Sequence, residues 1–239
     1  MAAVDDRPGF RRRFRVEPEP GCVRTAVEDD YHCMAVTVHH AGGVAHQVNA
    51  EMIRAPWTTC PGAVDALQQA FAGVPLADFA RHADKTTHCT HLYDLAVLGA
   101  AHAFDDRPVV YDILVSDPGD DGARHAEIRR DGEALLAWSE AGFHIRAPED
   151  IAGTRLDKLG RWIDAQEPSL REPARLLRWG NMIAHGRTRP MEQQSDASRM
   201  PPTCFTFQPD RARRARRVGE IRDFTRIAAQ PLEEPRYAP

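Results

Sequence analysis

The chain has 239 residues, of which 42% are hydrophobic and 28% charged, an ordinary composition for a soluble globular protein. Its net charge of −4 gives no overall attraction to nucleic acid or to an anionic membrane. No run approaches the roughly 20 apolar residues of a membrane span, and residues 1–13 lack the apolar core of a signal peptide. We therefore expect a cytoplasmic protein with no nucleic-acid or membrane partner.

The N-terminal part is expected to hold an arm and then a hairpin. Residues 1–23 combine an arginine run with a stretch of Pro and Glu, which indicates an arm or an edge strand. Alternating apolar residues predict strands over 31–38 and 44–48, and the Gly-Gly pair between them predicts the turn of a hairpin.

Two helices are predicted after the hairpin. Pro61 suits the first position of a helix that begins near Cys60, and Gly73 ends that helix. A second helix begins at or near Thr90 and runs to about Phe104. Hairpin and helices together, residues 24–105, are predicted to form the α+β sub-domain that carries the functional site.

The second half is expected to be a meander with two helices. Four short strands are predicted over 109–115, 124–130, 134–138 and 143–146, followed by helices over 156–165 and 171–184. These elements make a second sub-domain, residues 106–187. The remainder, 188–239, is rich in Pro, Arg, Gln and Ser and is predicted to be an extended or disordered tail, apart from a helical turn within 211–224. The fold class expected for the whole chain is α+β.

Two cysteines stand where helices are expected to begin, at Cys60 and Cys89. The positive end of a helix dipole lowers the pKa of a thiol there, and a thiolate is a nucleophile or a metal ligand. The alternative is that both are small buried apolar residues at caps. His88 and His91 flank Cys89, and of these two His91 is the one expected to face inward.

A histidine with a carboxylate partner is predicted on the first strand of the hairpin. His32 shares a strand face with Met34, Val36 and Val38 and is expected to be buried. A lone buried histidine is more often a core residue than a ligand. Asp30 lies two residues earlier on the same face, however, and an Asp–His couple fixes the tautomer of the imidazole and raises its basicity.

A metal site would have to be assembled from distant segments, because the chain has neither a CxxC pair nor an HExxH motif. A single zinc or iron ion is therefore expected only if several of these residues converge, and otherwise no cofactor is expected. The candidate ligands are Cys60, Cys89 and His91, with His32 or Asp30.

The C-terminal segment carries an arginine cluster between residues 211 and 217. Nucleic-acid binding is one interpretation of such a cluster. Acidic residues follow closely and no aromatic residues are interleaved, so a solvated tail, or one that bridges the subunits of a homo-oligomer, is favoured.

Several motifs together resemble a bacterial family that shares a domain of unknown function. They are Asp30-Tyr31-His32-Cys33-Met34, Arg54-Ala55-Pro56-Trp57, Cys60-Pro61-Gly62-Ala63 and Cys89-Thr90-His91-Leu92, followed by Arg130-Asp131-Gly132, Trp138 and Gly186-Arg187. The resemblance covers residues 24–187. It implies no established activity, but it implies that Asp30, His32, Cys60, Cys89 and His91 matter together.

A second likeness is to iron–sulfur cluster scaffold proteins of the U type. Cys60 and the His88-Cys89 pair stand at positions that match this pattern. The first cysteine of the pattern has only Cys33 or Asp30 as a stand-in. The likeness implies a similar α+β arrangement of a hairpin and helices.

The first functional hypothesis is a small-molecule enzyme, a lyase or hydrolase acting on an aromatic or other carbon-rich substrate, such as a carbon–carbon lyase of the retro-aldol type. His32, oriented by Asp30, would be the general base, and His91 or Cys89 the acid or a ligand. Arg54, Trp57 and Tyr93 are the candidate substrate-binding residues. The second hypothesis is a metal- or cluster-binding scaffold or sensor without turnover, and the third is an interaction module whose tail docks a partner.

Overall fold

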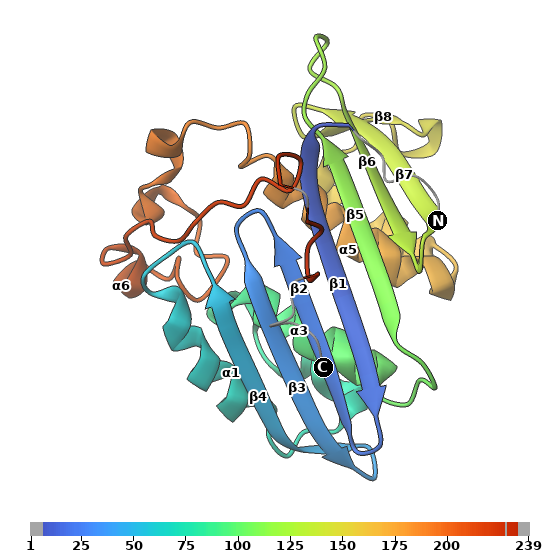
Figure 1. Cartoon of the computed structure of the whole chain (residues 1–239), viewed down its shortest axis with the longest axis vertical. Coiled ribbons are helices and arrows are strands. Elements are labelled where there is room, and N and C mark those ends of the chain that lie inside the picture. Colours follow the sequence, from blue (N-terminus) through green and yellow to red (C-terminus); the bar gives the residue numbers. More distant parts are fainter. Residues whose placement is uncertain (1–6, 228, 234–239) are drawn as a thin grey trace. The chain divides into compact units, whose positions relative to one another are not determined.

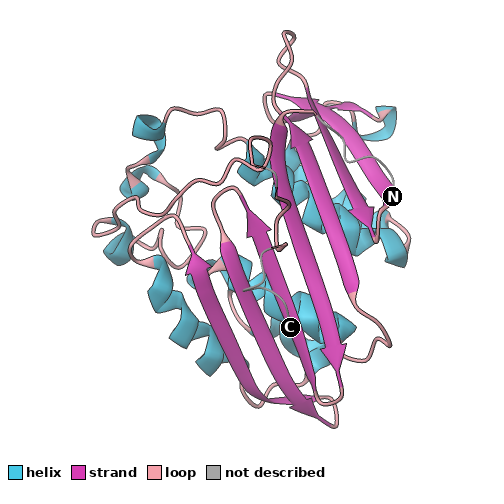
Figure 2. Ribbon diagram, in the orientation of Figure 1, coloured by secondary structure: helices cyan, strands magenta, loops and turns pink. Residues whose placement is uncertain are grey.

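The computed structural model describes residues 7–227 and 229–233. Its strands are β1 (Gly9–Glu19), β2 (Cys22–Asp29), β3 (Cys33–Ala41), β4 (Val44–Arg54), β5 (Val109–Ser116), β6 (Arg124–Arg130), β7 (Glu133–Ala141) and β8 (His144–Ala147). Its α-helices are α1 (Ala63–Phe71), α2 (Phe79–His82), α3 (Thr90–His102), α4 (Gly160–Ala165), α5 (Pro168–Ala184) and α6 (Pro209–Ala212). Figure 1 labels most of these elements, and Figure 2 distinguishes helices from strands.

Short 3-10 helices connect many of these elements. They are η1 (Cys60–Gly62), η2 (Leu76–Asp78), η3 (Lys85–Thr87), η4 (Glu149–Ile151), η5 (Leu156–Lys158), η6 (Met191–Gln194) and η7 (Ala197–Arg199). No helix in the described part of the chain is both long and apolar enough to cross a membrane.

The predicted fold class is wrong. The strands form one eight-stranded antiparallel sheet in the order β4-β3-β2-β1-β5-β6-β7-β8, so the chain has a mostly β fold. The expected hairpin exists as β3 and β4, but two further strands precede it, and the arrangement is not that of an iron–sulfur scaffold hairpin followed by helices. The α+β description fails because it held no strand β2 and gave residues 1–23 as an arm or an edge strand, whereas β1 and β2 both lie inside the sheet.

Residues 1–23 were predicted to form an arm or an edge strand, but β1 lies inside the sheet, between β2 and β5. Phe10, Phe14 and Val16 alternate along it and are fully buried. Arg12 is also buried, and its guanidinium lies over the rings of Phe10 and Trp179 at 5.5 and 5.0 Å from the centroids. A long side chain that packs its charge against aromatic rings can occupy a strand interior that composition alone assigns to solvent.

The chain divides into two compact units, which are described separately. Unit 1 contains the described parts of residues 1–13, 110–189 and 223–239, and unit 2 contains residues 14–109 and 190–222. Residues 1–6 of the predicted arm, and residues 228 and 234–239 of the predicted tail, lie outside the described part of the chain.

In unit 2, helices α1 and α3 cover one face of strands β2, β3 and β4 (Figure 1). The register pairs Val27 with Met34 across β2 and β3, and Val38 with Val48 across β3 and β4. Burial alternates only in the first half of β2 and the second half of β3; the last five residues of β2 and the first four of β3 are all buried. The hairpin and both predicted helices of this region are confirmed.

In unit 1, strands β5 to β8 form the predicted meander and α5 packs against β6 and β7 (Figure 2). Glu140 at the buried end of β7 is fully enclosed, where His185 Nε2 lies 2.9 Å and Arg124 Nε 3.5 Å from its carboxylate. Asn181 on α5 donates to the same carboxylate and accepts from the indole of Trp138. This polar network fixes α5 on the sheet.

The predicted extended or disordered tail is, over its described residues, folded. Residues 190–222 belong to unit 2 and form 3-10 turns and α6. Thr58 N donates to Arg216 O, Val218 N to Pro56 O, and Arg222 N to Asp30 O. These backbone hydrogen bonds fix the position of a segment that has no long helix or strand. Such a segment has no periodic pattern of apolar residues, so the sequence did not indicate that it is folded.

Candidate functional site

The site begins at the turn between β2 and β3. Strand β2 ends at Asp29, β3 begins at Cys33, and Asp29 N donates to His32 O across the turn. The carboxylate of Asp29 accepts from the backbone amides of Tyr31 at 2.7 Å and His32 at 2.8 Å. This is the local pattern by which an Asp side chain organises a turn.

The carboxylate that accepts from the ring of His32 is Asp29, one residue before the predicted partner Asp30. His32 Nδ1 donates to Asp29 Oδ1 at 3.0 Å, and Asp29 is fully buried. The prediction extended strand alternation back to residue 30, but residues 30–32 form the turn, where alternation does not apply. Because Nδ1 carries the proton in this hydrogen bond, the lone pair of the neutral ring resides on Nε2.

Helix α3 brings His91 to this turn. The rings of His32 and His91 are stacked with centroids 3.9 Å apart and planes inclined by 27°. Asp29, His32 and His91 are all buried, and each offers one ligand atom within 4.8 Å of the others. The predicted pairing of His32 with His91 is therefore present in the structure.

Close packing of α3 on β2 sets the position of His91. The hydroxyl of Thr25 donates to the carbonyl of Leu95 at 2.8 Å. A Cβ at Gly99 would lie 3.3 Å from Thr25 Cγ2, so glycine allows the helix to approach the strand at that point. His91 lies in the first turn of the same helix, two residues after its N-cap residue Cys89.

Arg54, one of the predicted substrate-binding residues, contacts groups of the protein itself. Its guanidinium donates to the backbone carbonyls of Asp29 and Asp30, each at 2.7 Å, and pairs with Glu28 at 3.0 Å. Arg222 also reaches Glu28, at 3.3 Å. The two arginines therefore clamp the turn that presents His32, and Arg54 has a positioning role.

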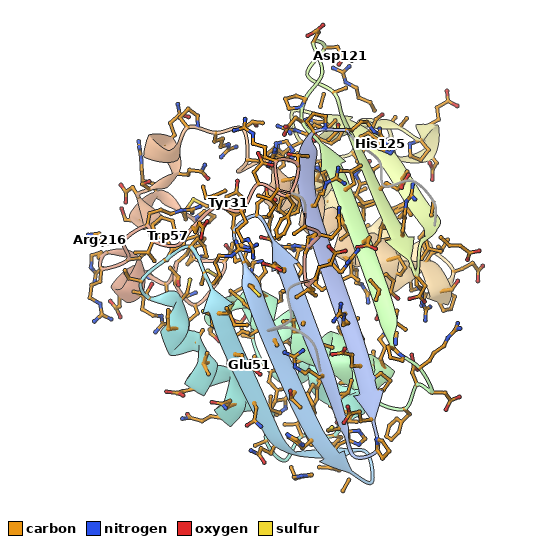
Figure 3. All side chains as sticks on the ribbon, in the orientation of Figure 1. Tyr31, Glu51, Trp57, Asp121, His125 and Arg216 are labelled. Atoms are coloured by element: carbon orange, nitrogen blue, oxygen red, sulfur yellow. The ribbon has the colours of Figure 1, made fainter. Side chains whose placement is uncertain are left out.

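The other two predicted substrate-binding residues are also held by the protein. The hydroxyl of Tyr93 donates to the carbonyls of Phe79 and Ala83 at 3.1 and 3.2 Å. Trp57 is buried with Ala197, Ala212, Ala215 and Phe207, and the guanidinium of Arg217 lies over its ring. Figure 3 labels Trp57 and Tyr31 at the same end of the strands of unit 2, with Arg216 farther out.

The expected thiolates are not found at Cys60 and Cys89. Burial raises the pKa of the Cys89 thiol from its ordinary 9.0 to about 12, and Cys60 and Cys204 nearby add to the rise. Burial also raises the pKa of Cys60, more than its contacts with Thr206, Trp57 and Arg217 lower it. Desolvation therefore outweighs the helix dipole, and both thiols are neutral near pH 7.

Sequence reasoning missed three residues of this region, namely Asp29, Arg222 and Cys204. Asp29 was one position from the residue chosen, and the turn that begins at it was the signal. Arg222 and Cys204 lie far along the chain in a segment without periodicity. No pattern in the sequence placed them beside the turn or the helix starts.

Comparison with protein-family models finds no match, and comparison with curated proteins finds none either. Among solved structures, a chain described as a viral glycoprotein is 13% identical with a TM-score of 0.21. The match covers 80% of this chain and 63% of that chain, so this chain spans less than two thirds of the other's length. A likeness at this TM-score carries no argument about fold or function.

Proposed function

We propose that the chain is a small-molecule hydrolase or lyase in which His32 is the general base, Asp29 its positioning residue, and His91 the second proton carrier. The observation that supports this most is the buried Asp29–His32 hydrogen bond with His91 stacked on the same ring. A carboxylate on Nδ1 of an imidazole whose Nε2 takes the proton is the arrangement used for general base catalysis.

The chemistry follows from the two rings. His32 Nε2 takes a proton from a water molecule or from a substrate hydroxyl, and the carboxylate of Asp29 stabilises the imidazolium that forms. In hydrolysis the resulting hydroxide attacks a carbonyl carbon. In a retro-aldol cleavage the resulting alkoxide collapses to a carbonyl and the carbon–carbon bond breaks. His91 then gives a proton to the leaving group.

The surroundings suit such a reaction. His32 and His91 each keep 8% of their surface exposed, so the pair is largely shielded from bulk water. Shielding strengthens the interaction of the imidazolium with Asp29. All five cysteines are free thiols, which supports a reducing, cytoplasmic location for the proposed enzyme.

A panel of aryl esters and aromatic β-hydroxy ketones tests the two reaction classes. We expect wild-type turnover of one class, with kcat/KM lowered about 10²- to 10⁴-fold by His32→Gln and by His91→Gln. Asp29→Asn should lower kcat more than it changes KM. His46→Gln is the matched control, because His46 is an exposed histidine on β4 of the same unit.

Two results contradict the proposal. One is a wild-type protein that turns over no member of either class. The other is turnover that survives His32→Gln and His91→Gln unchanged.

A metal-binding function is the second candidate, and the convergence of Asp29, His32 and His91 within 4.8 Å favours it. Two imidazoles and one carboxylate form a familiar ligand set for zinc or iron, with positions left for water or substrate. Elemental analysis of protein purified without chelator separates the two. Stoichiometric metal that is lost on His91→Gln and retained in His46→Gln favours the metal site, and a fully active metal-free protein excludes it.

A further inference from the structure

We propose that Arg217 binds a carboxylate of the substrate, so that the reaction proposed for His32 and His91 acts on organic acids; this assignment rests on that proposed function. Arg217 is the last of the five arginines between residues 211 and 217, the cluster for which the sequence favoured a solvated or subunit-bridging tail. Its surroundings differ from those of the other four.

The other four arginines of the cluster are occupied by their own loop. Each of them donates to an oxygen atom within residues 205–213, either a backbone carbonyl or the carboxylate of Asp210. In contrast, no described residue accepts a hydrogen bond from the Arg217 guanidinium or forms an ion pair with it. Arg217 is half-buried, so its charge is partly removed from water without an anionic partner. A charge in this state is costly unless an anion neutralises it.

Two aromatic rings hold the guanidinium of Arg217. Its central carbon lies 5.6 Å from the centroid of the Tyr31 ring and 5.4 Å from that of the Trp57 ring. Figure 3 labels both aromatic residues at the same end of the strands of unit 2. These contacts offset part of the desolvation cost of the charge. They do not use the N–H donors, which lie at the edges of the planar guanidinium and remain available to an acceptor.

The backbone on both sides of Arg217 is fixed to the segment that carries Trp57. Thr58 N donates to the carbonyl of the residue before Arg217 at 3.0 Å, and the amide of the residue after it donates to Pro56 O at 2.9 Å. Trp57 and Arg217 therefore lie opposite each other in an antiparallel bridge. A binding group that is held in place before its ligand arrives loses less entropy on binding.

Arg217 lies next to the turn that presents His32. Tyr31 belongs to that turn, and the centroid of its ring is 6.2 Å from that of His32 in an edge-to-face arrangement. The Tyr31 ring therefore contacts the guanidinium on one side and the proposed general base on another. An aromatic acid bound through its carboxylate at Arg217 would lie along Tyr31 and present its reacting group to the His32–His91 pair.

Electrostatics favour an anionic ligand at this position. Burial lowers the pKa of Arg217, and the two neighbours that oppose this effect, Tyr31 and Cys60, are not carboxylates. The Cys60 thiol is itself neutral near pH 7, because burial raises its pKa. A planar carboxylate can meet the N–H edge of a guanidinium in the same plane and accept two parallel hydrogen bonds. This match assigns the ligand to the carboxylic acids.

Binding is tested by NMR titration of the full-length protein with phenylacetate and with its neutral counterpart phenylacetamide. We expect the wild type to bind the acid at least about 10-fold more tightly than the amide. Arg217→Gln should weaken binding of the acid about 10- to 100-fold and leave binding of the amide unchanged. Arg217→Lys keeps the charge without the bidentate geometry and should retain part of the affinity. Arg213→Gln is the matched control, because Arg213 lies in the same loop but is exposed and paired with Asp210.

Turnover is measured separately, with an aryl ester that carries a carboxylate and with the same ester lacking it. For the carboxylated ester, Arg217→Gln should raise KM and leave kcat nearly unchanged, because it removes binding that the substrate and the transition state share. For the neutral ester both constants should stay as in the wild type. His32→Gln should abolish turnover of both esters and still bind phenylacetate, which separates the carboxylate site from the catalytic proposal.

Three results overturn the carboxylate site. They are equal affinity of the wild type for phenylacetate and phenylacetamide, which needs no folded variant; equal weakening by Arg217→Gln and Arg213→Gln; and about 10-fold tighter binding of phenyl phosphate, which would assign a phosphate ligand. Turnover that does not discriminate between the two esters also overturns it, while the catalytic proposal stands. Selective binding of phenylacetate through Arg217 by a protein that turns over neither ester supports the site and contradicts the catalytic proposal alone.

Discussion

Replacing Asp29 by Asn tests the organisation of the turn that presents His32. The side chain is fully buried and its Oδ1 accepts three hydrogen bonds, from the amides of Tyr31 and His32 and from His32 Nδ1. A hydrogen bond to a charged acceptor contributes about 1.5–3 kcal/mol and a neutral one about 0.5–1.5 kcal/mol. Replacing the carboxylate acceptor by a neutral amide therefore lowers the contribution of each hydrogen bond by about 1 kcal/mol.

Three such bonds predict that Asp29→Asn lowers the free energy of unfolding by about 3 kcal/mol. Urea denaturation followed by circular dichroism measures this value. The control is Glu51→Gln on β4, an exposed carboxylate labelled in Figure 3, which should change stability by less than about 0.5 kcal/mol.

A double-mutant cycle isolates the Asp29–His32 contact from the rest of the turn. Asp29→Asn, His32→Gln and the double variant should give a coupling energy of about 1–2 kcal/mol. The reasoning is refuted if the two substitutions are additive within about 0.5 kcal/mol, or if Asp29→Asn destabilises no more than Glu51→Gln.

Three further predictions concern pH and packing. Since burial raises the pKa of Cys89 from 9.0 to about 12, the unfolded chain ionises this thiol first. Stability should fall as pH rises from 9 toward 12, with a shallower slope in Cys89→Ala, as read from urea midpoints at each pH. Burial alone would raise the pKa of Glu140, but the hydrogen bond and charge of His185 outweigh it and hold the pKa below its ordinary 4.5. The ionised Glu140 therefore stabilises the fold above pH 4.5, and this contribution is lost as the pH falls through its lowered pKa. Glu140→Gln should make the melting temperature less dependent on pH in acid, and should lower the free energy of unfolding at pH 7 by about 3–5 kcal/mol. Gly9→Ala would place a Cβ 2.3 Å from a backbone carbonyl of β5 and should lower the free energy of unfolding, measured in urea, by more than about 3 kcal/mol. In the control Gly119→Ala the Cβ would lie 3.4 Å from the exposed side-chain carboxylate of Asp121, and stability should be nearly unchanged.

Local signals predicted most elements of the fold. Gly-Gly and Asp-Gly turns, alternating apolar residues, and Pro61 at the start of a helical segment gave the β3–β4 hairpin, the four strands of the meander and the principal helices. The sheet order was not predictable in this way. It depends on β1, whose buried Arg12 lies over the ring of Trp179, a residue far along the sequence.

The site was predictable only where it follows from a local pattern in the sequence. The pairing of His32 with His91 followed from one buried strand end and one helix start. The identity of the carboxylate did not, because a turn at residue 30 breaks the period on which the choice of Asp30 rested. The protonation state of Cys89 was not predictable either. Burial of the thiol is the main cause of its raised pKa, and the extent of that burial follows from tertiary packing that the sequence pattern does not show.

The tautomer of His32 tests the central claim most directly. Long-range ¹H–¹⁵N NMR of the native protein, at a pH where the ring is neutral, distinguishes protonation at Nδ1 from protonation at Nε2. The hydrogen bond to Asp29 predicts the Nδ1–H form in the wild type, with a shift toward the Nε2–H form in Asp29→Asn. An Nε2–H tautomer in the wild type, or a tautomer ratio that Asp29→Asn leaves unchanged, would contradict the assignment of His32 as the oriented base.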